Sequence, residues 1–457
     1  MRLERLSSSS IAPARYHPGV QGPLPSAPMR LERRGGGPAP SPTPRPSLRI
    51  AWLINLYPPY VVGGNEMLAH DVVVELRKRG HDVRVLTAQG SGFGDVPGVE
   101  SVLSYDLDTH RDVLFLGARP LTRKEELRSY TFDPRSYARV RRSVRKLEPD
   151  LVVVDNLHMA SAAPLLAVRS AGCPVVAQVA DKWLAYLLRD VRTTYKPTER
   201  FPRALVERYA RWVQPWLWRL GRPDAIVSVS DFIKQFYVAQ GFPAERIASM
   251  FLGVDTDLYV PRATPHAGAN DLEVVFSGQL WEGKGPQVLV DALGRLRVQE
   301  PDLVLRLRVI GNGSEHFKAY LHEEVRRAGM EERTTWDGFV RLPELAARLR
   351  QADLFVFPST WDEPFSITLP AAMASGAAVI ATRAGGTPAA FVDGEEGLLV
   401  PPGDAEALAG AILKLARDPG LRQRLSQAAI ARARRDWSFT AYVDRLERHY
   451  LSLAGKN

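Results

Sequence analysis

The chain has 457 residues, 45% of them hydrophobic and 24% charged, which excludes wholesale disorder, a collagen-like repeat and a multi-span membrane protein. This length predicts two or three domains. The single cysteine, Cys173, excludes an internal disulfide and a cysteine zinc cluster and is typical of a reducing compartment. The net charge is +9, but residues 1–49 alone contribute +6, with 8 Arg against 2 acidic residues. Residues 135–222 add 17 basic against 7 acidic residues, so the positive charge is confined to the first half of the chain.

Residues 1–47 lack the large apolar side chains that a core requires. They contain 10 of the 35 prolines, a serine run at 7–10 and three glycines at 35–37. This composition predicts a disordered tail. The segment has no continuous apolar stretch of the kind found in a secretory signal.

An alternation of strands and helices begins at Leu48. The apolar run 48–54 predicts a strand buried on both faces, and it is followed by a loop with Gly63 and Gly64 and by a helix over 66–79. Further strands are expected at 83–87, 151–154, 174–179 and 225–230. Such alternation is typical of a parallel, doubly wound sheet.

The same pattern starts again after Pro261. Strands are expected at 272–277, 303–310, 354–358 and 378–381. The fold class is therefore α/β, with two Rossmann-like domains at 48–258 and 259–436 that face each other across a cleft. No apolar run reaches the roughly 18 to 20 residues that span a bilayer.

Two loops at strand ends carry residues suited to a phosphate. Gly63 and Gly64 precede a helix, where glycine allows a ligand to approach the backbone and the helix N-terminus attracts an anion. Lys284, between two glycines, could pair with a diphosphate as a point charge. An ordinary tight turn and a solvated lysine are the competing interpretations.

A third loop contains Glu363 and leads into the apolar helix 369–375. Glu363 would reach sugar hydroxyls, and the free N–H groups of residues 366–368 would face a phosphate. A capped helix with an exposed acid is the alternative. His158 follows a strand end, where a structural role is favoured, and the 9 histidines show no metal spacing, so no metal site is predicted.

Basic and aromatic residues cluster in the first domain. Residues 135–146 hold six basic residues and no acid, and residues 181–222 interleave four tryptophans with ten basic residues. Tryptophan flanked by arginine suits an anionic membrane surface. The alternative is that the helically spaced aromatic stripe belongs to the core, and we favour it narrowly because such stripes are more often buried. The stripe consists of Val206, Tyr209, Val213, Trp216 and Leu220.

Together these segments resemble the family 4 retaining glycosyltransferases (glycosyltransferase group 1) of the GT-B fold, from about Leu48 to Leu453. The matching motifs are Gly63-Gly64-Asn65-Glu66, Arg79-Gly80-His81-Asp82, Gly278-Gln279-Leu280 with Lys284-Gly285, Glu363-Pro364-Phe365, Gly385-Gly386-Thr387-Pro388, and Gly397 to Asp404. Their order and spacing make the resemblance specific.

The resemblance implies transfer of a hexose, with retention, from a nucleotide diphosphate sugar to a glycan or lipid-linked acceptor in cell-surface polysaccharide or glycolipid synthesis. It implies that domain 48–258 binds the acceptor, that domain 259–436 binds the donor, and that helix 437–457 packs back on the first domain. Neither a metal nor a cofactor is required beyond the co-substrate, because lysine and helix dipoles stabilise the charge. The expected location is cytoplasmic, peripheral on the inner face of the plasma membrane, and nucleic acid is not an expected partner.

The family pattern also gives roles to individual residues. Lys284 would contact the donor diphosphate, Glu363 the transferred sugar, and Asp181 belongs to the catalytic loop after the third strand. The remaining substrate-binding residues implied by the resemblance are Gly63, Gly64, Gln279, Phe365, Ser366, Ile367 and Thr368.

The chain departs from the family pattern at Ala371, Gln279, Ala180 and Ala389. Ala371 stands where the second glutamate of the E-x7-E motif holds the nucleotide ribose. Losing such a charged hydrogen bond costs about 1.5–3 kcal/mol, or roughly tenfold to a hundredfold in donor binding. A competing hypothesis is therefore a non-catalytic GT-B protein that binds a glycan or a partner enzyme. A sugar-nucleotide epimerase is disfavoured by the family pattern over residues 353–404.

Overall fold

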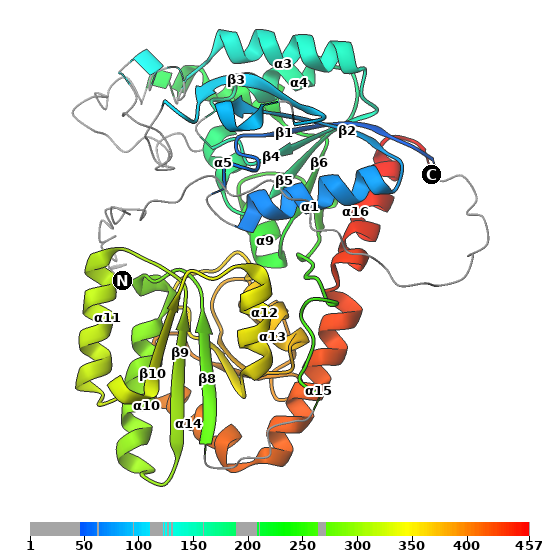
Figure 1. Cartoon of the computed structure of the whole chain (residues 1–457). Coiled ribbons are helices and arrows are strands. Elements are labelled where there is room, and N and C mark those ends of the chain that lie inside the picture. The colour runs from blue at the N-terminus through cyan, green and yellow to red at the C-terminus, as the bar shows by residue number, and fades with distance from the viewer. Residues whose placement is uncertain are drawn as a thin grey trace, which may run out of the picture.

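A computed structural model describes residues 46–61, 64–94, 96–109, 131–158, 160–188, 211–263 and 271–456, with single residues at 122, 124, 125, 128, 208 and 209 (Figure 1). These residues form a seven-stranded and a six-stranded sheet, both parallel, in two domains. Residues 1–45 of the predicted tail, Gly63 and Val206 lie outside the described residues. No helix within the described ranges combines the length and apolar character of a membrane span.

The first sheet has the order β3-β2-β1-β4-β5-β6-β7. Its strands are β1 (Arg49–Ile54), β2 (Asp82–Gln89), β3 (Val99–Asp106), β4 (Leu151–Asp155), β5 (Val175–Val179), β6 (Ala225–Ser228) and β7 (Ile247–Ser249). The central strands β1 and β4 are apolar and buried on both faces because helices cover the sheet on each side. The strand order reverses between β1 and β4, and ligands of doubly wound sheets bind at such a point.

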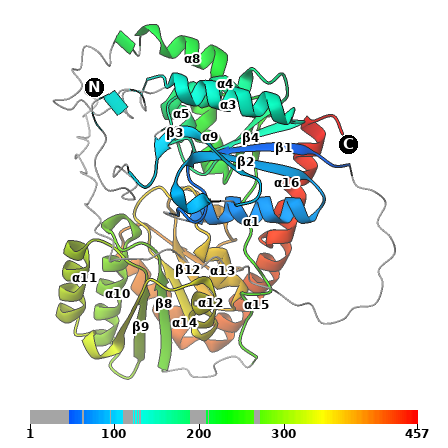
Figure 2. The same ribbon diagram turned by 45° about the horizontal axis from the view of Figure 1, so that its top comes forward.

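Helices cover both faces of this sheet. They are α1 (Gly64–Lys78), α3 (Pro134–Leu147), α4 (Ala163–Arg169), α5 (Trp183–Leu188), α8 (Gln214–Gly221) and α9 (Asp231–Ala239). Helix α1 packs with α16 (Phe439–Leu453), whereas α4 packs against both α3 and α8 (Figure 2). The three helices α3, α4 and α8 therefore form one layer of the domain.

The aromatic stripe around α8 is not part of the core, so the favoured interpretation of that stripe is wrong for most of its described members. Val213, Trp216 and Leu220 are exposed, and only Tyr209 is half-buried. Helix α8 packs inward through Leu217 instead. These residues do lie at helical spacing, but the opposite side of α8 packs inward, on α4 and α5.

The second sheet has the order β10-β9-β8-β11-β12-β13. Its strands are β8 (Asp271–Ser277), β9 (Val304–Ile310), β10 (Thr334–Gly338), β11 (Leu354–Phe357), β12 (Ala378–Thr382) and β13 (Leu398–Val400). Its helices are α10 (Pro286–Gln299), α11 (Glu315–Arg327), α12 (Leu342–Gln351), α13 (Thr368–Ala374), α14 (Ala405–Arg417) and α15 (Pro419–Asp436). Short 3-10 helices occur at η1 (Ser91–Phe93), η2 (Ala244–Arg246), η3 (Glu282–Lys284), η4 (Glu331–Arg333) and η5 (Thr387–Ala389).

The chain crosses between the domains twice, and the two crossings lie side by side. Val254 and Ser438 form a parallel bridge, with the Val254 amide 2.7 Å from the carbonyl oxygen of Trp437. A Cβ atom on Gly253 would lie 2.7 Å from the Cα of Phe439, so this close approach requires glycine.

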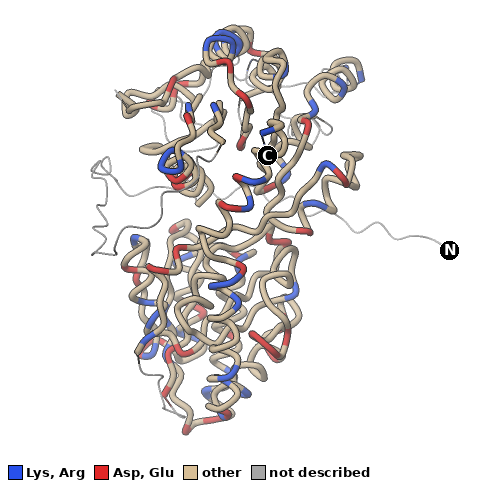
Figure 3. The backbone as a smooth tube through the Cα atoms, turned by 90° about the vertical axis from the view of Figure 1, so that its right-hand side faces the viewer, with Lys and Arg blue, Asp and Glu red and all other residues tan. Residues whose placement is uncertain are grey.

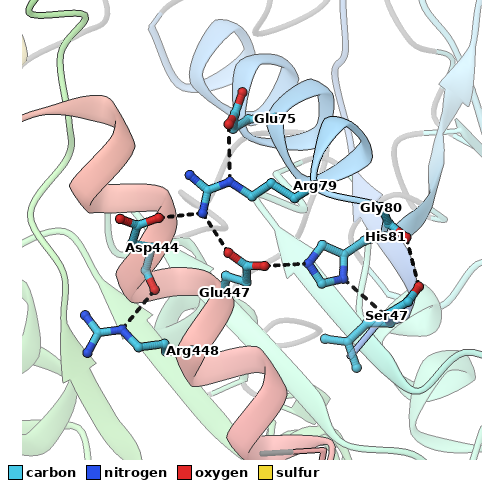
Figure 4. A network of polar contacts seen from close by, with 9 residues as sticks. Ser47, Glu75, Arg79, Gly80, His81, Asp444, Glu447 and Arg448 are labelled. Carbon is cyan, nitrogen blue, oxygen red and sulfur yellow. Dashed lines mark hydrogen bonds and ion pairs between the residues drawn. The ribbon is translucent and has the colours of Figure 1, made fainter. Parts of the chain in front are cut away.

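Helix α16 is held on the first domain by a buried polar cluster (Figure 4). The Glu447 carboxylate accepts from Arg79 Nη1 at 2.6 Å and lies 3.0 Å from His81 Nε2. His81 Nδ1 accepts from the Leu48 amide at 3.1 Å, so Nε2 carries a proton and donates to Glu447. The turn between α1 and β2 therefore fixes the helix that returns from the second domain.

Candidate functional site

The site lies where the carboxyl ends of the two sheets face each other. A Cβ atom on Gly64, the first residue of α1, would lie 3.4 Å from Ile367 Cδ1 of the other domain. The Ser230 hydroxyl donates to the Pro364 carbonyl at 2.6 Å, which is a second contact between the domains. The segment that contains Glu363 thus borders the domain interface.

Lys284 and Glu363 form the central ion pair of this site. Lys284 ends η3, which follows β8, and Glu363 follows β11, the neighbouring strand of the same sheet. Lys284 and Glu363 are 79 positions apart in the sequence, but the adjacent strands place Lys284 Nζ 2.6 Å from Glu363 Oε1. Glu363 is 2% exposed to solvent, whereas the side chain of Lys284 is 17% exposed. Solvent reaches the pair from the lysine side.

One oxygen of Glu363 is held by three groups. Besides Lys284, the Trp361 indole N–H donates to Oε1 at 2.6 Å, and the Ser359 hydroxyl lies 3.0 Å from it. The Ser359 proton can also go to the Gly283 carbonyl, likewise at 3.0 Å. No hydrogen bond to Oε2 occurs among the residues that the structure describes. The carboxylate is therefore fixed in orientation with one oxygen left for a ligand hydroxyl.

Two glycines allow the backbone to close around this pair. Gly285 has φ +71°, and a Cβ atom there would lie 1.9 Å from the Pro358 carbonyl oxygen. Gly385 has φ +54°, and a Cβ atom there would lie 2.3 Å from the Glu363 carbonyl oxygen. Both positions require glycine, and the Gly-Gly-x-Pro motif therefore packs directly behind Glu363.

Helix α13 points its N-terminus toward the same region. No side chain caps it, and the hydroxyl of Thr368, its first residue, lies 2.9 Å from that of Ser366, just before the helix. Its first backbone N–H groups can therefore serve a phosphate. Phe365 and Ile367 are half-buried and pack against the cores of both domains.

The structure brings Gln279 to the same loop as Lys284 but not to the ion pair. The side chain of Gln279 is exposed. On one side of it, the Leu280 amide donates to the Asn312 carbonyl at 2.8 Å. Ala371, in contrast, is buried in the core of the second domain and offers only a methyl group.

The first domain contributes a carboxyl cluster of which the sequence analysis predicted only Asp181. Asp155, the last residue of β4, is buried, and Asn65 Nδ2 donates to it at 3.3 Å. Burial raises the pKa of Asp155 to about 7, and the nearby charges of Glu66 and Asp181 add to that shift. Asp155 directly follows the predicted strand 151–154, and this position at a strand end was the available signal.

Asp181 lies after β5, in the first domain. Its Oδ1 accepts from the Trp183 amide at 2.7 Å, and desolvation raises its pKa despite this bond and the nearby His158. A small pocket lies beside the cluster and is lined by Asn65, Asp155, Ala180 and others. Within the described residues, no group of three His, Cys, Asp or Glu side chains could hold a metal ion.

Two family models match adjoining parts of the chain. Residues 62–258 match "Glycosyltransferase Family 4", and residues 271–418 match "Glycosyl transferases group 1". The chain belongs to the family 4, or group 1, glycosyltransferases. The first match lies within the first Rossmann-like domain and the second match within the second domain, and Lys284 and Glu363 both belong to the second match.

Relatives of the same class resemble the chain over different lengths. A D-inositol 3-phosphate glycosyltransferase from Pseudarthrobacter chlorophenolicus is 34% identical over 230 residues, which are 49% of this chain and 54% of that protein. The chain thus spans about half the length of such relatives. A glycogen synthase from Mycobacterium tuberculosis is 26% identical over 427 residues, which are 89% of this chain and 94% of that protein.

Similar solved structures confirm the predicted GT-B fold. Anabaena HepE in complex with UDP has a TM-score of 0.64 at 19% identity. The match covers 88% of this chain and 100% of HepE. Sucrose-phosphate synthase from Thermosynechococcus elongatus has a TM-score of 0.63 at 19% identity, over 90% of this chain and 100% of that one. At this level of identity the similarity shows the fold alone.

Proposed function

We propose that the protein is a retaining glycosyltransferase that moves a hexose from a nucleotide diphosphate sugar to a glycan or lipid-linked acceptor, in the synthesis of a cell-surface polysaccharide or glycolipid. The observation that carries the proposal is the Lys284–Glu363 pair at the domain interface, with one carboxylate oxygen held and the other available. Cytoplasmic location and independence of metal ions are parts of the same proposal. UDP and UDP-glucose in solved neighbours support a nucleotide-sugar donor.

The donor diphosphate is bound by the second domain. An ammonium group has three N–H donors, and one of those of Lys284 is engaged by Glu363. The other two would contact the diphosphate, together with the N–H groups of the first turn of α13 and the Gln279 amide. These groups stabilise the negative charge that develops as the diphosphate departs.

Glu363 would orient the transferred sugar through Oε2. Because Oε1 is held by Lys284 and Trp361, the direction of the free lone pairs is set before the sugar binds. A sugar without the matching hydroxyl would leave a nearly buried carboxylate oxygen without a donor. Sites built to bind a hydroxyl reject analogues that lack it for this reason.

The acceptor hydroxyl would enter from the first domain, between Asp181 and the N-terminus of α1. The bond between the anomeric carbon and the phosphate oxygen breaks, and the bond to the acceptor oxygen forms on the same face of the sugar. The proton of the acceptor hydroxyl passes to the departing diphosphate, because Ala180 supplies no base. Asp181 and the Asp155–Asn65 pair would position the acceptor.

Incubation of the chain with a panel of labelled nucleotide sugars tests this function. We expect slow hydrolysis, or transfer to added acceptors, from at least one donor, with a loss of more than about a hundredfold in Glu363→Gln and Lys284→Ala. Lys414→Ala, which changes an exposed lysine of α14, is the matched control and should leave the rate unchanged. No transfer and no hydrolysis from any donor would overturn the proposal.

The buried methyl group of Ala371 favours one competing function, a non-catalytic protein that binds a glycan or a partner enzyme. Calorimetry with UDP and GDP separates the two. A glycosyltransferase should bind one of these nucleotides, whereas a protein that only binds a partner should bind neither.

A further inference from the structure

An exposed apolar stripe follows one side of α8 and the residues just before it. Trp212 is 69% exposed, Trp216 62% and Leu220 54%, and these residues are spaced by four along the chain. Leu217, on the other side, is buried against the domain. The helix therefore already has its core contact, and the stripe is surplus to the folding of this domain. Large aromatic side chains exposed in a row mark an interaction surface.

The same side of the domain carries positive charge that no described acidic side chain pairs with. Arg208, Arg211 and Arg219 are exposed beside the stripe, and the sequence from 208 to 222 contains no acid. On α3 the exposed basic residues are Arg135, Arg139, Arg142, Arg145 and Lys146. None of these side chains forms an ion pair with a described residue.

The second domain shows the contrast. On α11, Arg326 pairs with Glu323 and Arg327 with Glu324. Single charges on a helix surface are usually balanced in this way, a few positions along the helix. Because no such pair joins α3 to another described residue, its charges favour an anionic surface. Figure 3 marks the positions of Lys and Arg in blue and of Asp and Glu in red along the backbone.

The basic helix and the aromatic helix lie in one layer. Helix α4 packs against both α3 and α8, and Figure 2 shows these helices on the side of the first domain away from the second. Crossover helices run opposite to the strands of a parallel sheet, so the N-terminal ends of α3 and α8 lie near the carboxyl edge. Trp212 lies just before the N-terminal end of α8, toward that edge of the sheet.

We propose that α3 and α8 form a docking face for an anionic lipid bilayer, with Trp212, Trp216 and Leu220 inserted at the headgroup boundary. Arginine with tryptophan on one helical surface matches a bilayer, because the rings enter the interface while the cations contact lipid phosphates. Nucleic acid would use the cations but not Val213 or Leu220. A second copy of the chain would place like charges opposite one another. Docking is independent of the proposed transfer activity, although it would present the cleft to a lipid-linked acceptor.

The test measures, by co-sedimentation, the binding of the full chain to vesicles of phosphatidylcholine with or without 30% phosphatidylglycerol. We expect binding to the anionic vesicles only, weakened by salt. Trp212→Ala with Trp216→Ala should weaken it more than about tenfold, and each of Arg139→Gln and Arg142→Gln about fivefold. Val298→Ala with Phe339→Ala is the matched control, because these residues are 77% and 69% exposed on the second domain.

The basic tail needs its own control, since it also attracts anionic lipid. A full-length chain with the seven arginines of residues 1–45 changed to glutamine should keep its dependence on Trp212 and Trp216. Quenching of tryptophan fluorescence by lipids brominated near the headgroup should occur in the parent chain and decrease in the double variant. Equal binding by the parent and the double tryptophan variant would overturn the proposal. The proposal would also be overturned if the parent chain did not bind vesicles and the double variant instead lost a dimer or lost binding to nucleic acid.

Discussion

Replacing Glu447 with alanine should destabilise the contact between α16 and the first domain. Glu447 is 6% exposed and accepts from two groups, Arg79 at 2.6 Å and His81 at 3.0 Å. Removal of one partner from a buried charge cluster costs about 3–5 kcal/mol. Arg79 keeps Glu75 and Asp444 as partners, so we expect a loss of about 3 kcal/mol, the lower end of that range.

Asp444→Ala is a closely matched control. Asp444 accepts from the same Nη1 atom of Arg79 at the same distance of 2.6 Å, and it lies on the same helix. Its side chain is 50% exposed, and exposed pairs contribute about 0–1 kcal/mol. The two variants thus differ mainly in burial.

Urea unfolding monitored by circular dichroism, with proteolysis at the α16 junction as a second probe, gives the comparison. Because a two-domain chain need not unfold in one step, the transition of the first domain is the one to evaluate. Equal losses in Glu447→Ala and Asp444→Ala would refute the reasoning, since burial would then not decide the energy.

The pH dependence provides a further check of the same cluster. Burial alone would raise the pKa of Glu447, but its bonds with Arg79 and His81 outweigh this effect and hold the pKa below the usual range. Its stabilising contribution is therefore complete above the unfolded carboxyl pKa, about 4.3, and is lost as the pH falls through the folded value. The free energies of unfolding of the parent chain and Glu447→Gln should converge once the pH falls below the folded pKa of Glu447.

Three other predictions concern the site and its backbone. Trp361→Phe removes one bond to the Glu363 carboxylate, so kcat/KM for the best donor should fall tenfold or more, roughly 1.5–3 kcal/mol, and an unchanged value would exclude Trp361 as a positioning residue. Gly285→Ala should lower the thermal midpoint because its Cβ atom meets a carbonyl oxygen, whereas Gly410→Ala, inside α14 with free space around it, should raise it; the reverse order would contradict the close approach of Gly285 to Pro358. Asp155 has a folded pKa of about 7, above its unfolded value, so its stabilising contribution is lost as the pH rises from about 4 to 7. Unfolding of Asp155→Asn should lack this pH dependence, and identical curves for variant and parent would show that Asp155 does not titrate as proposed.

The sequence pattern predicted the central strands well because they are buried on both faces. The expected strand 354–358 corresponds to β11 at Leu354–Phe357, and 151–154 corresponds to β4 at Leu151–Asp155. The edge strands β3 and β10 were not predicted, since Val99–Asp106 and Thr334–Gly338 mix polar and apolar residues. An edge strand has fewer covered positions and therefore a weaker apolar pattern.

The sequence singled out several residues of the candidate site but not the bonds between them. Lys284 and Glu363 were identified from their loops, yet their direct pairing depends on β8 and β11 being neighbours, which local sequence does not specify. Trp361 lies two positions before Glu363 in the same loop, and its role depends on the direction of the indole N–H. Asp155 was missed because its raised pKa arises from burial by distant segments.

The aromatic stripe of α8 shows a different limit. A period of about four residues identifies a helix with an apolar side, but it does not say whether that side meets the sheet or the solvent. Leu217 and the half-buried Trp218 already provide the inner contacts, which only the packing of α8 on α4 and α5 reveals.

The paired crossings at Val254 and Ser438 mean that the second domain begins and ends at almost the same point in space. The second domain is therefore an inserted domain, placed between β7 and α16 of the first domain. A donor module from another family member could thus be exchanged with two cuts at adjacent positions. The recipient would keep every element of its own core, including the helix that completes it.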